Sequence, residues 1–304
     1  MASVSIANGG GGGGGGEIKR PRGRPKTDGN TGNLPINGIT NAPKNSDNMI
    51  EVLIQDTSTF KKMMKPYLSE KTGTQYITFN FLSDNFEIYS FNHFKNARLQ
   101  IRYNPARLST YYVREEMSPV VLTSELNFIG KLDKNHIGIR FYIKTTMPHI
   151  LGIDLLFMNG STTSKEISIV RDDDYELQDG ESEGEDHALH AVFPMALIKS
   201  FVSGTTLDKN GNNTCQIEGY KNEYIKLSDS NNSATNIHGN DVQITNSCDY
   251  IGVSIYIKLI NLFISSAISN TVHMYLDEYH KVILRSDAEN GICSYTVFIS
   301  HKDS

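Results

Sequence analysis

The chain has 304 residues, enough for two domains, and 29 Lys and Arg against 34 Asp and Glu give it a net charge of −5. An acidic chain is a poor general binder of nucleic acid, so affinity for a phosphate backbone requires basic residues that gather on one face. The three cysteines are widely spaced and form no CxxC pair, so neither a metal nor another cofactor is expected. The apolar runs are well short of the roughly 20 residues of a membrane span, so no membrane contact is expected. These features predict an intracellular, non-secreted protein.

Residues 1–48 are expected to form a disordered basic tail. They contain a glycine run at 9–16 and the segment KRPRGRPK at 19–26, and they bury too little apolar surface to fold. Six basic residues stand against three acidic ones here, a charge of +3, so the remainder of the chain carries −8.

The segment KRPRGRPK looks like an AT-hook. Glycine lets the backbone approach the floor of a narrow minor groove, and arginines enter its negative potential. The residues expected to contact DNA are Arg20, Arg22, Gly23, Arg24 and Lys26. A nuclear localisation signal or a generic basic tether fits the same residues.

The next part of the chain, 49–170, begins with a strand and an amphipathic helix at 49–71. Asp56, Thr57 or Ser58 is the expected helix cap, and Pro66 should kink or shorten the helix. A second helix is expected at 122–135. Aromatic and β-branched runs predict strands at 75–82, 86–91, 97–103, 109–115, 136–146, 149–158 and 165–171.

Residues 171–186, RDDDYELQDGESEGED, hold nine carboxylates and one arginine. Like charges at this density favour an extended, solvated loop. The consecutive aspartates at 172–174 converge poorly on one ion, so no metal site is expected. We expect this acidic segment to join two domains, 49–170 and 187–304.

The second domain repeats the first. Residues 187–206 again read as a strand and an amphipathic helix, and a second helix follows at 256–269. An offset of about 135 residues indicates a duplicated domain and not a solenoid. Further strands are expected at 215–220, 223–229, 241–247, 248–254, 272–278, 281–287 and 293–300.

A 3.6-residue wheel gives each of the four helices one apolar and one polar face. The residues expected in the core are Phe60, Met63, Met64, Tyr67, Leu68, Leu122, Leu126, Ile129, Leu132, Leu197, Ile198, Phe201, Val202, Ile257, Ile260, Phe263, Ile264, Ala267 and Ile268. The polar faces hold few carboxylates, and their lysines are Lys61, Lys62, Lys65, Lys131, Lys134, Lys199 and Lys258. We therefore predict an α+β fold with positively charged helices on one side of antiparallel sheet.

Four stretches resemble DNA polymerase sliding clamps of the proliferating cell nuclear antigen (PCNA) type. They are TSTFKKMMK at 57–65, VVLTSELNFIGKL at 120–132, EYIKLSDS at 223–230 and IKLINLFISSAISNTVHMYLDEYHKVIL at 257–284. The resemblance rests on order and spacing over residues 49–304. The acidic segment is similar to the connecting loop of clamps in place and charge. The basic tail resembles clamps of large DNA viruses more than cellular ones.

The resemblance implies two tandem clamp domains that form a ring, with sheets outside and two helices per domain inside. Clamps of this type are closed trimers that encircle double-stranded DNA. It thus implies a processivity factor for replication and repair, with DNA polymerase, other replication proteins and a clamp loader as partners, in the nucleus or a viral replication compartment. Lys61, Lys62, Lys131 and Lys258 stand at DNA-facing positions of the family, whereas Ser265 replaces a frequent lysine.

The resemblance also implies a groove under the connecting loop that accepts a short peptide of a partner. His93 aligns with a groove histidine, and Tyr175, Leu177 and Ile299 are expected walls; a loop histidine without a role is the alternative for His93. Edge strands close the ring in this family, and 97–103 or the strands near Leu151 and Ile217 are the candidates.

A second function fits the same sequence, an architectural DNA-binding protein whose tail contacts DNA and whose body is an interaction module. A ring needs a closed assembly, so the oligomeric state distinguishes the two. No enzyme is expected, because the sequence has no G-x-S-x-G, HExxH, P-loop or acidic pair tied to a base.

Overall fold

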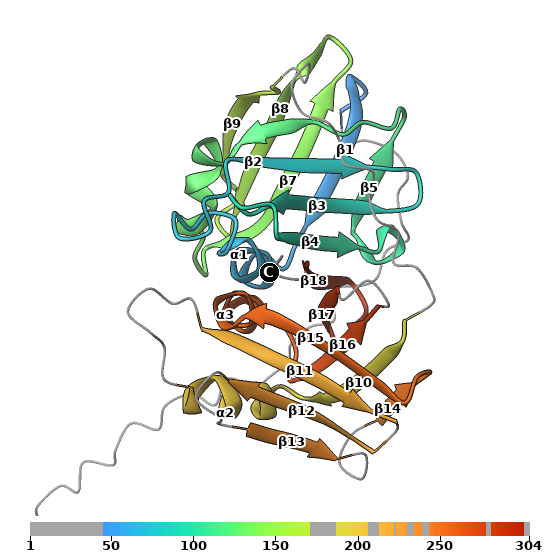
Figure 1. Ribbon diagram of the computed structural model, residues 1–304. Coiled ribbons are helices and arrows are strands. Elements are labelled where there is room, and N and C mark those ends of the chain that lie inside the picture. The colour runs from blue at the N-terminus through green and yellow to red at the C-terminus, as the bar shows by residue number, and fades with distance from the viewer. Residues whose placement is uncertain are drawn as a thin grey trace, which may run out of the picture. The chain divides into compact units, whose positions relative to one another are not determined.

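The computed structural model describes residues 45–170, 187–205, 213–221, 223–229, 234–238, 243–277 and 281–300, all of which belong to one compact unit (Figure 1). Several expected site residues lie outside these ranges, namely Arg20, Arg22, Gly23, Arg24, Lys26, Tyr175 and Leu177.

The described residues show the same element order twice: one strand, a helix, five strands, a helix and three strands. The first half runs β1 (Asn48–Ile54), α1 (Thr57–Met64), β2 (Tyr76–Phe81), β3 (Phe86–Phe91), β4 (Ala97–Tyr103), η1 (Pro105–Arg107), β5 (Thr110–Val113), β6 (Val120–Leu122), η2 (Thr123–Lys131), β7 (His136–Lys144), β8 (Met147–Phe157) and β9 (Thr162–Ser168). The short turn η1 is the one element without a counterpart among the described residues of the second half. That half runs β10 (Leu189–Pro194), α2 (Met195–Gly204), β11 (Thr214–Tyr220), β12 (Tyr224–Asp229), β13 (Ala234–His238), β14 (Gln243–Asn246), β15 (Tyr250–Tyr256), α3 (Ile257–Ser266), β16 (Thr271–Leu276), β17 (Val282–Asp287) and β18 (Cys293–Ile299).

Strand pairing repeats as faithfully as element order. In the first half β1 lies between β5 and β7, and in the second β10 lies between β14 and β16. Likewise β2 pairs with β3 and β6, and β11 with β12 and β15. All these ladders are antiparallel, so the predicted α+β fold with antiparallel sheets is confirmed.

One ladder joins the two halves. Strand β4 pairs with β18, from Ala97 opposite Ile299 to Tyr103 opposite Cys293. This pairing, which we call the seam, creates a nine-stranded sheet in the order β14-β10-β16-β17-β18-β4-β3-β2-β6. A five-stranded sheet, β5-β1-β7-β8-β9, and a four-stranded sheet, β13-β12-β11-β15, complete the described fold.

The edge strands are not those expected from the sequence. Residues 97–103 form β4, and the strands at Leu151 and Ile217 are β8 and β11, all of which have a neighbour on both sides. Which strands lie at an edge follows from long-range pairing, which residue pattern alone does not specify. Within the described residues, the strands that pair on one side only are β5, β6, β9, β13, β14 and β15.

Helix α1 begins at one of the expected caps and is shortened before Pro66, so that Tyr67 and Leu68, which the wheel placed on it, lie beyond its end. The Asp56 carboxylate accepts a hydrogen bond of 3.0 Å from the backbone N–H of Thr59, which caps the first turn. The helix ends at Met64, two residues before Pro66, because proline lacks an N–H and its ring clashes with the preceding turn. Phe60 is fully buried and its ring meets that of Phe141 on β7 edge-on, with centroids 5.8 Å apart.

The second helix of the first half is a 3₁₀ helix, η2, and not the α-helix implied by the wheel. Its buried residues are Thr123, Leu126 and Ile129, followed by Leu132. A spacing of three is the period of a 3₁₀ helix, in which residues i and i+3 eclipse. Leu122, expected in the core, is 38% exposed as a result.

Candidate nucleic-acid interface

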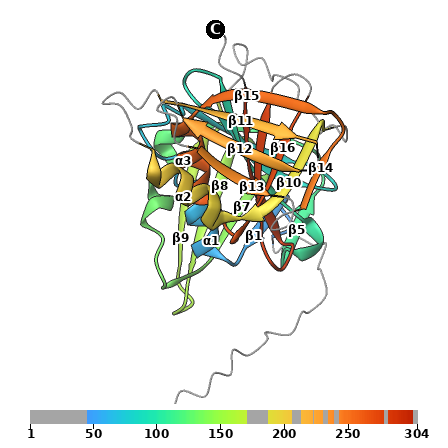
Figure 2. The same ribbon diagram turned by 60° about the horizontal axis from the view of Figure 1, so that its bottom comes forward.

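The four helices form a continuous row. Helix η2 contacts α1, α1 contacts α3 across the two halves, and α3 contacts α2. Figure 2 shows α1, α2 and α3 gathered on one side of the sheets. Each buries an apolar face against the core, as Ile198 and Phe201 of α2 and Ile260 and Phe263 of α3 do. The polar faces are thereby left on one shared surface.

Five of the seven lysines predicted for this surface are exposed and unpaired. None of the five forms an ion pair with any carboxylate that the structure describes. They are Lys62, Lys131 and Lys199 on the helices, and Lys65 and Lys134 just beyond the ends of α1 and η2. Flexible ammonium groups without internal partners attract a phosphate backbone and do not read base edges.

Lys62 of α1 and Lys199 of α2 line one small hollow of about 110 Å³ at the C-terminal end of α3. Asn270 and Glu289 also line it. Burial, and then the charge of Lys199, lowers the pKa of Lys62 below its usual value. Two like charges that share a hollow attract an anion, and the Glu289 carboxylate, which lines the same hollow, offsets part of their charge.

The remaining two predicted lysines already have partners. The Lys61 ammonium donates a hydrogen bond of 2.6 Å to the carbonyl oxygen of Leu132, which ties α1 to the end of η2. The Lys258 ammonium lies over the rings of Tyr256 and Phe94, 4.8 and 5.4 Å from their centroids. Both are less available to a ligand than the five unpaired lysines.

Two of the carboxylates beside the helices are engaged elsewhere. Glu125 of η2 pairs with Lys165 on β9 at 3.1 Å. Asp133 accepts hydrogen bonds from the Asn135 backbone and from His136, which lower the pKa of Asp133. The negative charge along this row is therefore partly compensated, whereas the five lysines are not.

The structure describes two of the residues predicted to form a peptide groove. His93 is exposed in the turn between β3 and β4, where its backbone N–H donates to the Thr72 carbonyl oxygen at 3.2 Å. Ile299 is fully buried in the core, so the expectation that it forms a groove wall is wrong. Side chains alternate along a strand, and the outward neighbour of Ile299 is the half-buried Phe298.

Phe298 belongs to an aromatic row that sequence reasoning missed. The row crosses six strands of the nine-stranded sheet, on the face turned away from the core, and each member is opposite the next. Its members, which we call the seam row, are Phe91, Arg98, Phe298, Ile283, Tyr275 and His190. Alternation in β4 and β18 predicts their outward direction, but the long-range register that aligns them is absent from the sequence pattern.

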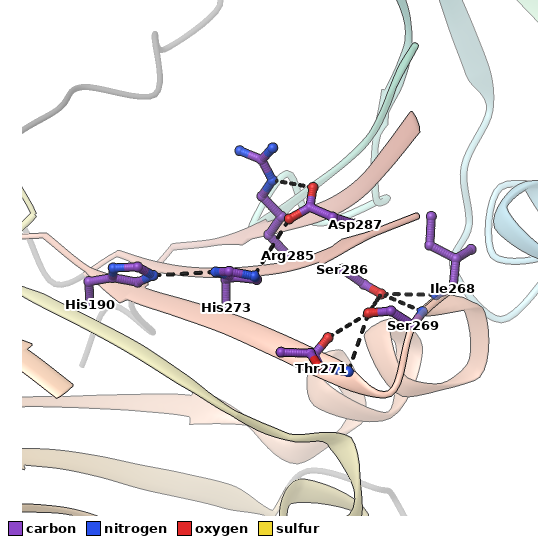
Figure 3. A network of polar contacts seen from close by, with 8 residues as sticks. All are labelled: His190, Ile268, Ser269, Thr271, His273, Arg285, Ser286 and Asp287. Atoms are coloured by element: carbon purple, nitrogen blue, oxygen red, sulfur yellow. Dashed lines mark hydrogen bonds and ion pairs between the residues drawn. The ribbon is translucent and has the colours of Figure 1, made fainter. Parts of the chain in front are cut away.

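A polar network lies next to the end of the seam row (Figure 3). The His190 and His273 ring nitrogens approach to 3.4 Å, and Asp287 lies 3.7 Å from His273 and 2.8 Å from the Arg285 Nε. Burial, and then the neighbouring His273 and His187, lowers the pKa of His190. On the opposite face of β17, the buried Ser286 Oγ accepts the backbone N–H groups that follow α3.

The described residues contain no group of three or more His, Cys, Asp or Glu placed to hold a metal ion. None of their helices is long and apolar enough to cross a membrane. Burial raises the pKa of Cys215 and of Cys293 to about 12, as expected for structural thiols.

No protein-family model matches the sequence, and no curated protein matches it either. The fold is similar to the crystal structure of the proliferating cellular nuclear antigen of Entamoeba histolytica, with a TM-score of 0.66 and 14% sequence identity. The match covers 84% of this chain and 100% of that one. The chain therefore has the PCNA-like sliding-clamp fold, carried by a strongly divergent sequence.

Proposed function

We propose that this chain is a DNA sliding clamp, a processivity factor that closes into a ring around duplex DNA and tethers polymerases and repair enzymes. The observation that carries the proposal is the row of helices with five unpaired lysines on it or just past its helix ends, in a chain of net charge −5. Residues 49–170 and 187–304 are then its two clamp domains, with 171–186 as the connecting loop.

Ring closure follows from the internal repeat. Strands β9 and β13 occupy the places in their halves that β18 and β4 occupy in the opposite halves. Since β18 and β4 pair within the chain, β9 of one copy is suited to pair with β13 of the next. Three copies joined head to tail in this way form a homotrimer with six similar units.

In this ring the helices line the channel, and Lys62, Lys65, Lys131, Lys134 and Lys199 contact DNA phosphates. The contacts are independent of base sequence, which suits a protein that slides. The basic tail, through Arg22 and Arg24, adds a second contact that captures DNA. Replication enzymes bind through short peptides, and a clamp loader opens the ring at the site of replication.

Light scattering after size-exclusion chromatography tests the assembly. The clamp predicts three times the chain mass. A monomer at every concentration, with DNA binding that depends only on residues 1–48, would instead favour the architectural alternative. Retention on DNA adds a second test, because a ring held on a nicked circle at high salt must leave when the circle is cut.

A further inference from the structure

Two histidines from different strands meet on the outward face of the second half. His190 of β10 stands opposite Tyr275 of β16, and His273 of β16 stands opposite Val192 of β10, so the two histidines are diagonal neighbours across the ladder. Their neighbours along each strand point into the core. The Nε2 of His190 and the Nδ1 of His273 face each other at 3.4 Å (Figure 3).

This distance is long for a hydrogen bond and suits two ligands of one metal ion. Hydrogen bonds donated by N–H groups are mostly shorter, near about 3 Å. Two imidazole nitrogens that each lie about 2.0–2.1 Å from a tetrahedral zinc ion are separated by about 3.3–3.4 Å. The ion lies beside the line that joins the two nitrogens, so both rings must turn toward it. The outer torsion of a histidine side chain has a broad energy minimum, which allows this turn.

The surrounding side chains prepare both imidazoles as ligands. The Tyr275 ring stacks on His190, with centroids 4.3 Å apart and planes 6° from parallel. The Nε2 of His273 lies 3.7 Å from Asp287, and Arg285 holds that carboxylate through Nε at 2.8 Å. A carboxylate behind an imidazole selects the tautomer whose other nitrogen is free to bind a metal. The pKa of His190 is lowered, chiefly by burial, which favours the neutral form that metal binding requires.

We propose that His190 and His273 bind a divalent transition-metal ion, Zn²⁺ or Cu²⁺, which joins β10 to β16 on the outer face of the sheet. Imidazole nitrogen suits both ions, whereas Mg²⁺ and Ca²⁺ prefer oxygen ligands. Water completes the coordination, because the described residues offer no group of three ligands. The sequence pattern gives no sign of this site, since the two histidines are 83 residues apart. The proposal goes beyond the proposed function and does not depend on the ring.

An anion fits this pair of histidines less well. Two charged imidazoles would attract one, but the low pKa of His190 keeps its ring mostly uncharged at neutral pH. The Asp287 carboxylate beside His273 would also repel it. A cation between two neutral rings avoids both costs.

The test is titration calorimetry of the full-length protein, freed of any affinity tag, with zinc, copper or magnesium chloride. One Zn²⁺ should bind per chain, Cu²⁺ should bind at least as tightly, and Mg²⁺ should not bind. His190→Gln and His273→Gln should each weaken zinc binding at least tenfold. Asp287→Asn keeps both ligands and should weaken it about tenfold to a hundredfold, as expected for a carboxylate that orients a ligand. Zinc should also raise the thermal unfolding midpoint of the parent but not of His190→Gln.

His149→Gln is the matched control. His149 is an exposed histidine of β8, so its loss should leave zinc binding unchanged. Thermal unfolding of each variant without metal shows whether it folds. The proposal is overturned if the parent binds no zinc, if the site survives in either histidine variant, as it would on a thiol such as Cys248, or if His149→Gln weakens binding as much. A monomer that binds zinc as expected would refute the ring and leave this proposal intact, and a ring that binds none would do the reverse.

Discussion

The lysines of the helix row separate into two groups, and this difference predicts which of them bind DNA. Lys62 and Lys199 share a hollow and have no ion-pair partner among the described residues. The Lys61 ammonium is hydrogen-bonded to a backbone carbonyl, and the Lys258 ammonium lies over two rings. We expect the double variant Lys62→Gln/Lys199→Gln to lose more DNA affinity than Lys61→Gln/Lys258→Gln, although both lose the same formal charge.

The magnitude follows from counterion release. Each lysine that neutralises one phosphate contributes about 0.9 to the slope of log affinity against log salt. Loss of Lys62 and Lys199 should therefore lower the slope by about 1.8 for each copy of the chain whose two lysines contact phosphates. Over a fourfold rise in salt, the parent should then lose about tenfold more affinity than the variant for each such copy. The Lys61/Lys258 variant should lower the slope by clearly less.

Fluorescence anisotropy of a labelled duplex, titrated with full-length protein between about 50 and about 200 mM salt, measures both slopes. Thermal unfolding of each variant controls for folding. Equal slopes for the two double variants, or a slope for Lys62→Gln/Lys199→Gln equal to that of the parent, would refute the assignment of these lysines to the DNA surface.

Three further outcomes are expected. The variant Ser286→Ala leaves two backbone N–H groups after α3 without their buried acceptor, so chemical denaturation should show a free energy of unfolding lower by about 1–3 kcal/mol. The control Ser203→Ala, at an exposed position of α2, should change it little. Equal effects of the two variants would contradict the role of Ser286 as a cap. In the folded chain the pKa of His190 lies below its ordinary value, so the unfolded chain takes up the proton first and the stability of the fold falls as the pH drops below about 6.5. The variant His190→Gln should flatten this fall in a series of denaturation curves at different pH. An unchanged dependence of stability on pH would point to another group, such as His273. Deletion of 1–48 should weaken duplex binding at low salt and leave the number of chains per oligomer unchanged, and an undiminished affinity would remove the tail from the DNA-binding surface.

Local features of the fold could be predicted because they depend on nearby residues. The 3.6-residue period of α1, α2 and α3 placed Phe60, Ile198 and Phe263 in the core. Pro66 set the end of α1 through its missing N–H. The 3₁₀ form of η2 could also have been predicted, because its buried residues recur at every third position. A wheel of 3.6 residues per turn does not fit this spacing, and it placed Leu122 in the core.

Features that depend on strand pairing could not be predicted. Strand β13 was missed, because its residues, ATNIH, are few and mostly polar. Ile299 was assigned to the surface, although an offset of one residue along β18 exchanges the core face for the outer face. The contacts of Arg98 with the Tyr89 and Phe298 rings had no sequence signal, because they require β3, β4 and β18 to be aligned.

Electron microscopy of negatively stained full-length protein is the most direct test of the proposed ring. The account predicts closed particles of repeated similar units around an opening as wide as duplex DNA. Particles that are compact and without an opening in every assembly state would contradict it.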